Sequence, residues 1–411
     1  MFNVLKKMAA LAGFMGGIAG LWLPTGSAAA ADSVPLLAQA APATSAVPAA
    51  PTDPAAAQLP PGATMPASPP VRMALLLPNR NGMFGAAADA VRTGFLTAYS
   101  RQKENIQLAI VETGDSVQDM QRAYDDASAK YDILIGPLSR SAVTAVAQSG
   151  RVSKPTIALA QPDLPGETEA QLPPLMLTVG LSIDDEARQV ANWVEKEKRP
   201  GKIFAIATSV AWQKRAVRSF QARARQLGLA VETLELTTPN NALSAPGLAQ
   251  LTKRVEQEKP ALIFAALDAS QAVQLRSAIG TELPVYGTSQ INPFTLNRDN
   301  PNDKMPELDG VRLIDIPWQL EPDNVAVSRY PRPAGNEGDR PNADLARLYA
   351  LGIDSYRVAR EIALRRSGFD LDGVTGRLNV NMVGGGATYF QRQETQAVFQ
   401  DGLPVPIADQ Y

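Results

Sequence analysis

The stretch Tyr131–Gln148, YDILIGPLSRSAVTAVAQ, decides how the fold of this chain is interpreted. Ile133–Ile135 is a short aliphatic run of the kind that forms a strand buried on both faces. Gly136-Pro137 ends the run, because proline cannot donate to a sheet ladder and glycine accepts a sharp turn. Ser139 then caps a helix whose apolar positions share one face. In a parallel sheet such a βα unit presents backbone N–H groups at the edge where ligands bind.

The same unit recurs on both sides of this stretch. Short strands alternating with helices through short connections predict parallel sheets with helices on both faces, and two successive halves predict two α/β lobes. A further strand, the longest helix at 343–363 and a last strand and hairpin predict that the chain recrosses between the lobes, about three times in all. The expected strands of the two halves lie at 72–77, 107–111, 133–135 and 156–160, and at 202–207, 229–236, 261–265 and 284–286; the later ones lie at 310–316, 374–380 and 388–398.

The N-terminus has the pattern of an export signal. Lys6-Lys7 precede the apolar run Met8–Leu23, and the small residues up to Ala31 suit a cleavage site. The alternative is an uncleaved inner-membrane anchor. The run is shorter than the ~20 residues of a normal membrane span, which favours the cleaved signal. The predicted division is a signal peptide at 1–31, a disordered Ala/Pro-rich tether at 32–70, a first lobe of 71–182 plus about 308–368, and a second lobe of 183–307 plus about 369–411.

The composition narrows the function classes. The 411 residues include no cysteine and no histidine, which removes disulfides, thiolate nucleophiles, histidine bases, lipidation at cysteine and most zinc or iron sites. The formal charge is −2 with interspersed charges, so no nucleic-acid partner is expected. We expect no cofactor, no metal and no catalytic residues, since only a carboxylate pair would remain as acid and base. The expected location is the periplasm, as an exported protein that is not a lipoprotein.

Four segments resemble the LppC/LpoA family of penicillin-binding-protein activators. The first two are typical of type I periplasmic binding proteins in general, and the third is the more specific. The resemblance implies a two-lobed, type I periplasmic-binding-protein-like (Venus flytrap) module. Enteric members carry a lipid-modified cysteine and a helical-repeat domain before this module, whereas here the predicted tether stands in their place. The four segments are Leu75–Pro78 (LLLP), Ile135–Leu138 (IGPL), Leu348–Arg357 (LYALGIDSYR) and Thr375–Leu378 (TGRL).

The resemblance implies a non-enzymatic regulator that binds a bifunctional penicillin-binding protein, a peptidoglycan synthase, and thereby promotes peptidoglycan synthesis. The alternative is the substrate-binding protein of an ABC importer for an amino acid or a similar small polar solute. A solute-binding protein must close on its ligand, so ligand binding distinguishes the two classes.

A small ligand between the lobes would contact loops that follow strands. Ser139 is expected to bind a carboxylate, to cap its helix, or both. Trp212 would stack on a ligand or pack in the core, and Asp268 would neutralise an ammonium group or remain a solvated loop residue. The complete set of candidates is Asn79, Asn81, Ser139 and Gln161 from the first lobe, Trp212 and Asp268 from the second, and Gln290 near the expected hinge.

Overall fold

The computed structural model describes residues 69–163, 172–294, 304–333, 342–382 and 388–407. The predicted signal peptide, nearly all of the predicted tether and the glycine run at 384–386 lie outside these ranges. The described part is a mixed α/β fold that contains two large sheets and one small sheet.

The first sheet is entirely parallel, with the strand order β2-β1-β3-β4-β5. Side chains of β1 alternate between its two faces: Met73 and Leu75 face a core shared with α1 and α10, whereas Ala74 and Leu76 face α2 and α3. The expected strand Ile133–Ile135 is confirmed and is buried on both faces. The elements are β1 (Val71–Pro78), α1 (Gly85–Arg101), β2 (Ile106–Thr113), α2 (Val117–Ser128), β3 (Ile133–Ile135), α3 (Arg140–Gln148), β4 (Thr156–Ala158) and β5 (Met176–Thr178).

The second sheet has the order β15-β14-β10-β9-β8-β6-β7 and is parallel from β7 to β10. One face packs against α4 and α5 and the other against α6 and α7. Both large sheets are therefore mostly parallel and have helices on both faces, which confirms the prediction from the sequence. The elements are α4 (Ile183–Glu197), β6 (Ile203–Ala207), α5 (Ala211–Gln226), β7 (Val231–Glu235), η2 (Pro239–Asn241), α6 (Ala245–Glu258), β8 (Leu262–Ala265), α7 (Ala269–Ile279), β9 (Val285–Gly287), η3 (Ser289–Ile291), η5 (Pro306–Leu308), β10 (Arg312–Asp315), β14 (Thr395–Gln400) and β15 (Leu403–Pro406).

The last third of the chain follows the prediction only in part: α10 packs in the core of the first sheet and β14 and β15 join the second sheet as expected, whereas other elements exchange lobes. The expected first lobe included 308–368, but β10 pairs with β9 and β14 in the second sheet. The expected second lobe included 369–411, but the small antiparallel sheet packs into the hydrophobic core of the first sheet. These short strands suit either core, and local sequence does not specify their long-range partners. The elements are α8 (Pro317–Leu320), α9 (Val325–Ser328), α10 (Ala343–Ala363), β11 (Gly368–Asp372), β12 (Arg377–Asn381) and β13 (Tyr389–Gln393).

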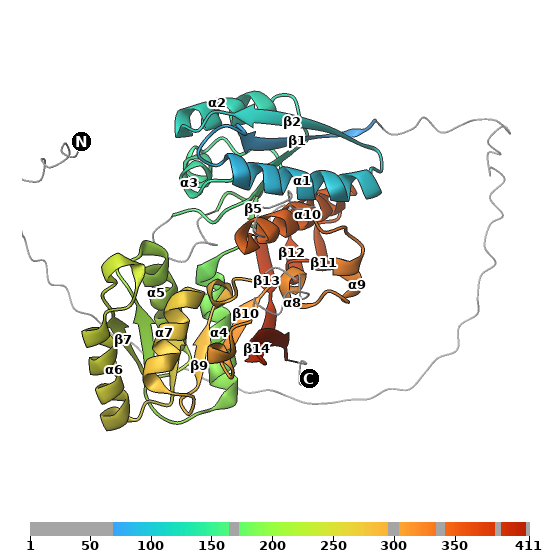
Figure 1. Cartoon of the computed structure of the whole chain (residues 1–411). Coiled ribbons are helices and arrows are strands. Elements are labelled where there is room, and N and C mark those ends of the chain that lie inside the picture. The colour runs from blue at the N-terminus through green and yellow to red at the C-terminus, as the bar shows by residue number, and fades with distance from the viewer. Residues whose placement is uncertain (1–68, 164–171, 295–303, 334–341, 383–387, 408–411) are drawn as a thin grey trace, which may run out of the picture. The chain divides into compact units, whose positions relative to one another are not determined.

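Helix α10 lies directly alongside α1, although the two are far apart in sequence (Figure 1). Gly352 lies at the contact, and a Cβ added there would lie 2.8 Å from the backbone nitrogen of Phe95 and closer still to the carbonyl oxygen of Val91. Tyr356 packs edge-on against Phe95, with ring centroids 5.3 Å apart. The absence of a side chain at Gly352 therefore allows the close approach that buries Tyr356.

We predict that Gly352→Ala lowers the free energy of unfolding by about 1–3 kcal/mol, because the new methyl group overlaps the backbone of α1. Alanine itself favours a helix by up to about 1 kcal/mol, so a net loss reports the overlap. Urea unfolding measures the change. Gly368→Ala is the matched control, since its Cβ would meet nothing closer than 4.0 Å. Equal stability of wild type and Gly352→Ala would contradict this packing.

Candidate functional site

The polar residues predicted at the strand ends of the first sheet are largely engaged in local structure. Asn79 and Asn81 are exposed after β1, and the Oδ1 atom of Asn79 accepts the N–H of Asn81 at 3.0 Å. Ser139 caps α3 by accepting the N–H of Ala142 at 3.3 Å, so its predicted capping role is confirmed. Gln161 donates to the carbonyl oxygen of Thr178 on β5 at 3.3 Å. Binding of a ligand by these side chains stays a prediction.

The candidates in the second sheet are similarly divided. Asp268 forms a capping box at the start of α7, where its Oδ1 accepts the N–H of Gln271 at 2.8 Å. It is therefore a helix cap rather than a solvated loop residue. Trp212 is the second residue of α5 and is half-buried, and Gln290 is half-buried in η3. Apart from the Asn79–Asn81 turn, no hydrogen bond or ion pair within the described ranges joins any two of the seven candidates.

The polar centre of the fold lies instead where the chain passes between its cores. The passages run from β5 to α4, from β10 to α8 and from β13 to β14, so the prediction of about three crossovers is confirmed. Buried or half-buried polar side chains gather at all three passages, and we call them the crossover cluster. Its members are Glu186, Gln189, Ser289, Asn292, Asp315, Arg347, Arg392 and Glu394.

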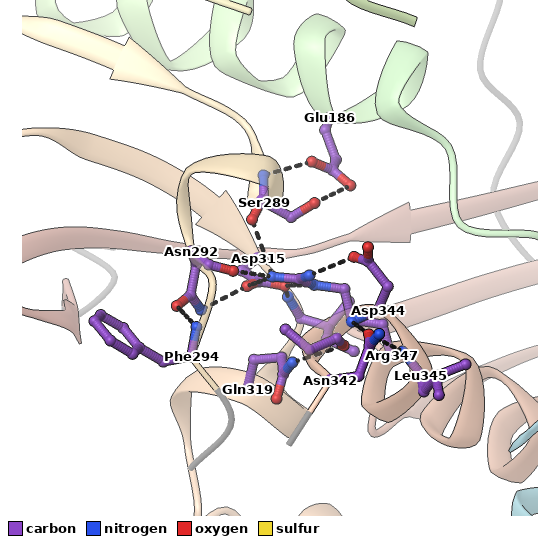
Figure 2. Close-up of polar contacts among 12 residues, drawn as sticks. Glu186, Ser289, Asn292, Phe294, Asp315, Gln319, Asn342, Asp344, Leu345 and Arg347 are labelled. Atoms are coloured by element: carbon purple, nitrogen blue, oxygen red, sulfur yellow. Dashed lines mark hydrogen bonds and ion pairs between the residues drawn. The ribbon is translucent and has the colours of Figure 1, made fainter. Parts of the chain in front are cut away.

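A two-point ion pair forms the middle of the crossover cluster (Figure 2). Arg347 on α10 donates from Nη2 to Asp315 Oδ2 at 2.7 Å and from Nε to Asp315 Oδ1 at 3.0 Å. The same Nη2 also donates to the carbonyl oxygens of Ser289 and Asn292, each at 2.9 Å. Asp315 is fully buried at the end of β10, so the pair is isolated from water and Arg347 connects α10 to the second sheet.

Glu186 is linked to the central ion pair through Ser289, whose carbonyl oxygen accepts from Arg347. Ser289 donates to it twice, from its backbone N–H to Oε2 at 2.7 Å and from its hydroxyl to Oε1 at 3.0 Å. Burial, together with the nearby charge of Asp315, raises the pKa of Glu186 to about 8, although the Ser289 bonds and Arg347 act in the opposite direction. The Glu186 carboxyl group is consequently held mostly protonated near pH 7.

The third passage is held by Arg392 and Glu394. Arg392 on β13 donates to the carbonyl oxygens of Val179 at 2.6 Å and Gly180 at 3.1 Å, at the passage from β5 to α4. The backbone N–H of Glu394 donates to the side-chain oxygen of Gln189 on α4 at 2.9 Å. Burial and the proximity of Glu186 raise the pKa of Glu394 well above its usual value. These contacts join the first passage to the third.

None of the sequence-predicted candidates is a member of the crossover cluster. One candidate, Gln290, is the sequence neighbour of its member Ser289. One signal was present: Asp315 lies within the otherwise apolar run Leu313–Ile316, where an unpaired charge would be costly. The cluster's hydrogen bonds go mostly to its own members and to backbone groups. These hydrogen bonds therefore hold the backbone of the three passages in place. Among the described residues no group of three or more acidic side chains is placed to hold a metal ion.

Removing the cation of the central pair should be strongly destabilising. We predict that Arg347→Met lowers the free energy of unfolding by about 3–5 kcal/mol, because it leaves Asp315 buried without a counter-charge. The control is Asp344→Asn, which removes the other ion pair of Arg347 at 3.0 Å. Asp344 is mostly exposed, so its loss should cost less than about 1 kcal/mol. Urea unfolding measures both changes in free energy. Similar losses in the two variants would contradict a larger contribution of the central pair to stability.

The raised pKa of Glu186 predicts a pH dependence of stability. The folded protein keeps the proton up to a pH of about 8, whereas the unfolded chain releases it at about pH 4.3. Stability should therefore fall as the pH rises from 5 to 8, by up to roughly 1.4 kcal/mol per pH unit for one proton. Glu186→Gln should make this slope less steep in melting curves, and the raised pKa of Glu394 accounts for the slope that remains.

The control for this measurement is Glu258→Gln. Hydrogen bonds from Arg254 and Lys202 lower the pKa of Glu258 to about 2, so it stays charged throughout the range from pH 5 to 8. Its substitution should leave the slope as in wild type. Stability that rises with pH over this range in wild type, or an unchanged slope in Glu186→Gln, would contradict a protonated Glu186.

Comparison with known proteins identifies a family and a curated relative that match this chain. The model of the family described as "LppC putative lipoprotein" matches residues 22–402. The penicillin-binding protein activator LpoA of Photobacterium profundum is 25% identical over 373 residues, which cover 82% of this chain and 57% of the relative. The chain thus spans little more than half the length of that curated relative.

Solved structures give the same fold. A "putative branched-chain amino acid ABC transporter" from Chromobacterium violaceum ATCC 12472 has 32% identity and a TM-score of 0.63, over 80% of this chain and 100% of that one. The C-domain of LpoA (YraM) from Haemophilus influenzae, described as a regulator of PBP1A, has 21% identity and a TM-score of 0.62, over 82% of this chain and 100% of that one.

The fold is therefore periplasmic-binding-protein-like, as the sequence predicts. No helix within the described ranges has both the length and the hydrophobicity needed to cross a membrane. The family model covers nearly the whole described fold, including all three passages. The chain belongs to the LppC family.

Proposed function

We propose that this protein is a non-enzymatic activator of a bifunctional penicillin-binding protein and that it promotes peptidoglycan synthesis by binding that synthase. The observation that carries the proposal is the match to a relative named as a penicillin-binding protein activator over 82% of the chain. The likeness to the LpoA C-domain over the whole of that domain supports the same assignment of fold. The chain would correspond to this C-terminal module.

The chemistry of the described polar groups supports a binding role. Ser139 and Asp268 are used as helix caps, and the buried carboxyl group of Glu186 faces hydrogen-bond donors within the protein. Neither histidine nor cysteine is present in the sequence. A regulator that acts through its surface needs no proton-transferring side chain.

The proposed location is the periplasm. A cleaved signal at 1–31 would export the protein, and the segment 32–70 would act as a tether only if the signal is retained. Because the sequence contains no cysteine, we propose a form that is not acylated at cysteine.

A solute-binding role is the second candidate. It is favoured by the 32% identity to the structure described as a "putative branched-chain amino acid ABC transporter", all of which is covered. In this case an amino acid or a similar small polar solute would bind near the strand ends that carry Ser139 and Trp212.

The direct test combines the full chain with a purified bifunctional synthase and its lipid-linked substrate. We expect faster glycan polymerisation or crosslinking with the protein present, and no product from the protein alone. Turnover of purified peptidoglycan by the protein alone would contradict the non-enzymatic assignment. No stimulation of any synthase from the same organism would contradict the activator assignment.

The solute-binding candidate is tested on the same preparation by thermal shift with amino acids, peptides and peptidoglycan fragments. Alanine variants at Ser139 and Asp268 would lower stability simply by removing helix caps. Ser139→Thr and Asp268→Asn keep the caps, and Trp212→Ala removes the aromatic face. A ligand-induced shift that these variants abolish, without synthase stimulation, would favour the second candidate.

A further inference from the structure

Helix α5 has an unusual charge distribution. Its sequence, AWQKRAVRSFQARARQ, contains five basic residues and no acidic residue, in a chain whose formal charge is −2. Its apolar residues Ala216, Val217 and Phe220 pack against the second sheet. The charged residues therefore occupy the sides and the outer face of the helix.

Three of the five basic side chains have partners within the protein. Lys214 pairs with Glu235 at 3.0 Å, and Arg215 lies 3.8 Å from a carboxylate oxygen of Asp184. Arg223 donates to side-chain oxygens of Asn192 at 2.7 Å and of Gln226 at 3.1 Å.

Arg218 and Arg225 are different. Both are exposed, and no acceptor for either guanidinium group is found in the described ranges. The two positions are seven residues apart, which places them on one face of the helix about 10 Å apart along its axis. Lys214 lies four residues before Arg218 on the same face. We call Lys214, Arg218 and Arg225 the basic stripe.

Several arginines on other surface helices of the described fold are paired with acidic residues on the same helix. Arg254 pairs with Glu258 on α6 at 2.7 Å, and Arg122 on α2 and Arg188 on α4 pair with acidic residues three positions earlier. The basic stripe instead sets Lys214 and Arg218 at a spacing where like charges repel. Glu235 compensates Lys214, whereas Arg218 and Arg225 have no such partner among the described residues. A departure from local charge balance of this kind is typical of a functional surface.

We propose that the basic stripe is the docking surface for an acidic surface of a protein partner, and specifically of the synthase, so that this inference rests on the proposed function. Each exposed guanidinium group can form two-point hydrogen bonds with a carboxylate, and the two positions are about 10 Å apart along the helix axis. A lipid surface is a poorer fit. The apolar side of α5 is buried in the protein and cannot insert, and the stripe has fewer basic residues than the roughly 4–8 of a lipid-binding cluster.

The test measures the affinity of the full chain for the purified synthase at two salt concentrations. Arg218→Glu/Arg225→Glu should weaken binding about tenfold or more at low salt, mainly through slower association. Arg218→Lys/Arg225→Lys keeps the charge but loses the two-point hydrogen bonds, so its affinity should lie between those of wild type and the Glu variant. Binding by wild type should weaken as salt increases, and binding by the Glu variant should depend less on salt.

The matched control is Lys253→Glu/Lys259→Glu, at one position on α6 and at the C-cap residue that follows it. Helix α6 packs on the opposite face of the same sheet. Both pairs of substitutions change the charge equally and each includes a position at the C-terminal end of its helix. Melting curves confirm that both variants are folded. The control should bind the synthase within about twofold of wild type.

The outcomes separate the two proposals. Absence of wild-type binding to the synthase would overturn the proposed function and this inference with it. Binding by wild type and the Glu variant with equal affinity would overturn the docking surface and leave the proposed function standing. Vesicles containing phosphatidylglycerol provide the remaining arm. If they bind wild type but not the Glu variant, while both bind the synthase equally, the basic stripe contacts a membrane surface instead.

Discussion

The two-point pair between Arg347 and Asp315 is the interaction on which the rest of the fold depends. Transferring both charges out of water is expensive, and the attraction between them offsets this only if the remaining hydrogen-bonding capacity is satisfied. Here the carbonyl oxygens of Ser289 and Asn292 accept from the guanidinium group, and the side chain of Asn292 donates to the carboxylate at 2.8 Å. The pair therefore fixes the backbone of η3 and the end of β10 as well as the two side chains.

Most of the layered architecture was predictable because it follows from local patterns. Ile133–Ile135 forms a strand buried on both faces, and Ser139 caps the helix after it, as the residue types require. The partners of later strands were not predictable in this way. Arg312, at the start of β10, pairs with Val398 on β14, close to the end of the chain. A strand of four residues carries no local information about such a partner.

The candidate site was less predictable for a related reason. Polar residues after strands can be selected from a sequence, yet Ser139 and Asp268 are helix caps, a role that the same residue types fill well. The crossover cluster joins residues distant in sequence, with Glu186 and Ser289 separated by 103 positions. The sequence indicates the crossover cluster only through a charged residue within an apolar run, such as Asp315. Such a residue does not indicate which residue is its partner.

Helix α10 connects these observations to function. Arg347, in its first turns, holds the passage after β10, while Gly352 and Tyr356 further along pack against α1. A movement of α10 relative to β10 would separate Arg347 from Asp315 and leave both charges buried and unpaired, at a cost of several kcal/mol. A solute-binding protein works by changing its interlobe geometry, whereas a regulator that acts through its surface benefits from keeping that geometry fixed. The position of this buried ion pair at a passage between the two cores therefore suits the proposed regulator, because its outer helices, including α5, would be presented to a partner in one arrangement.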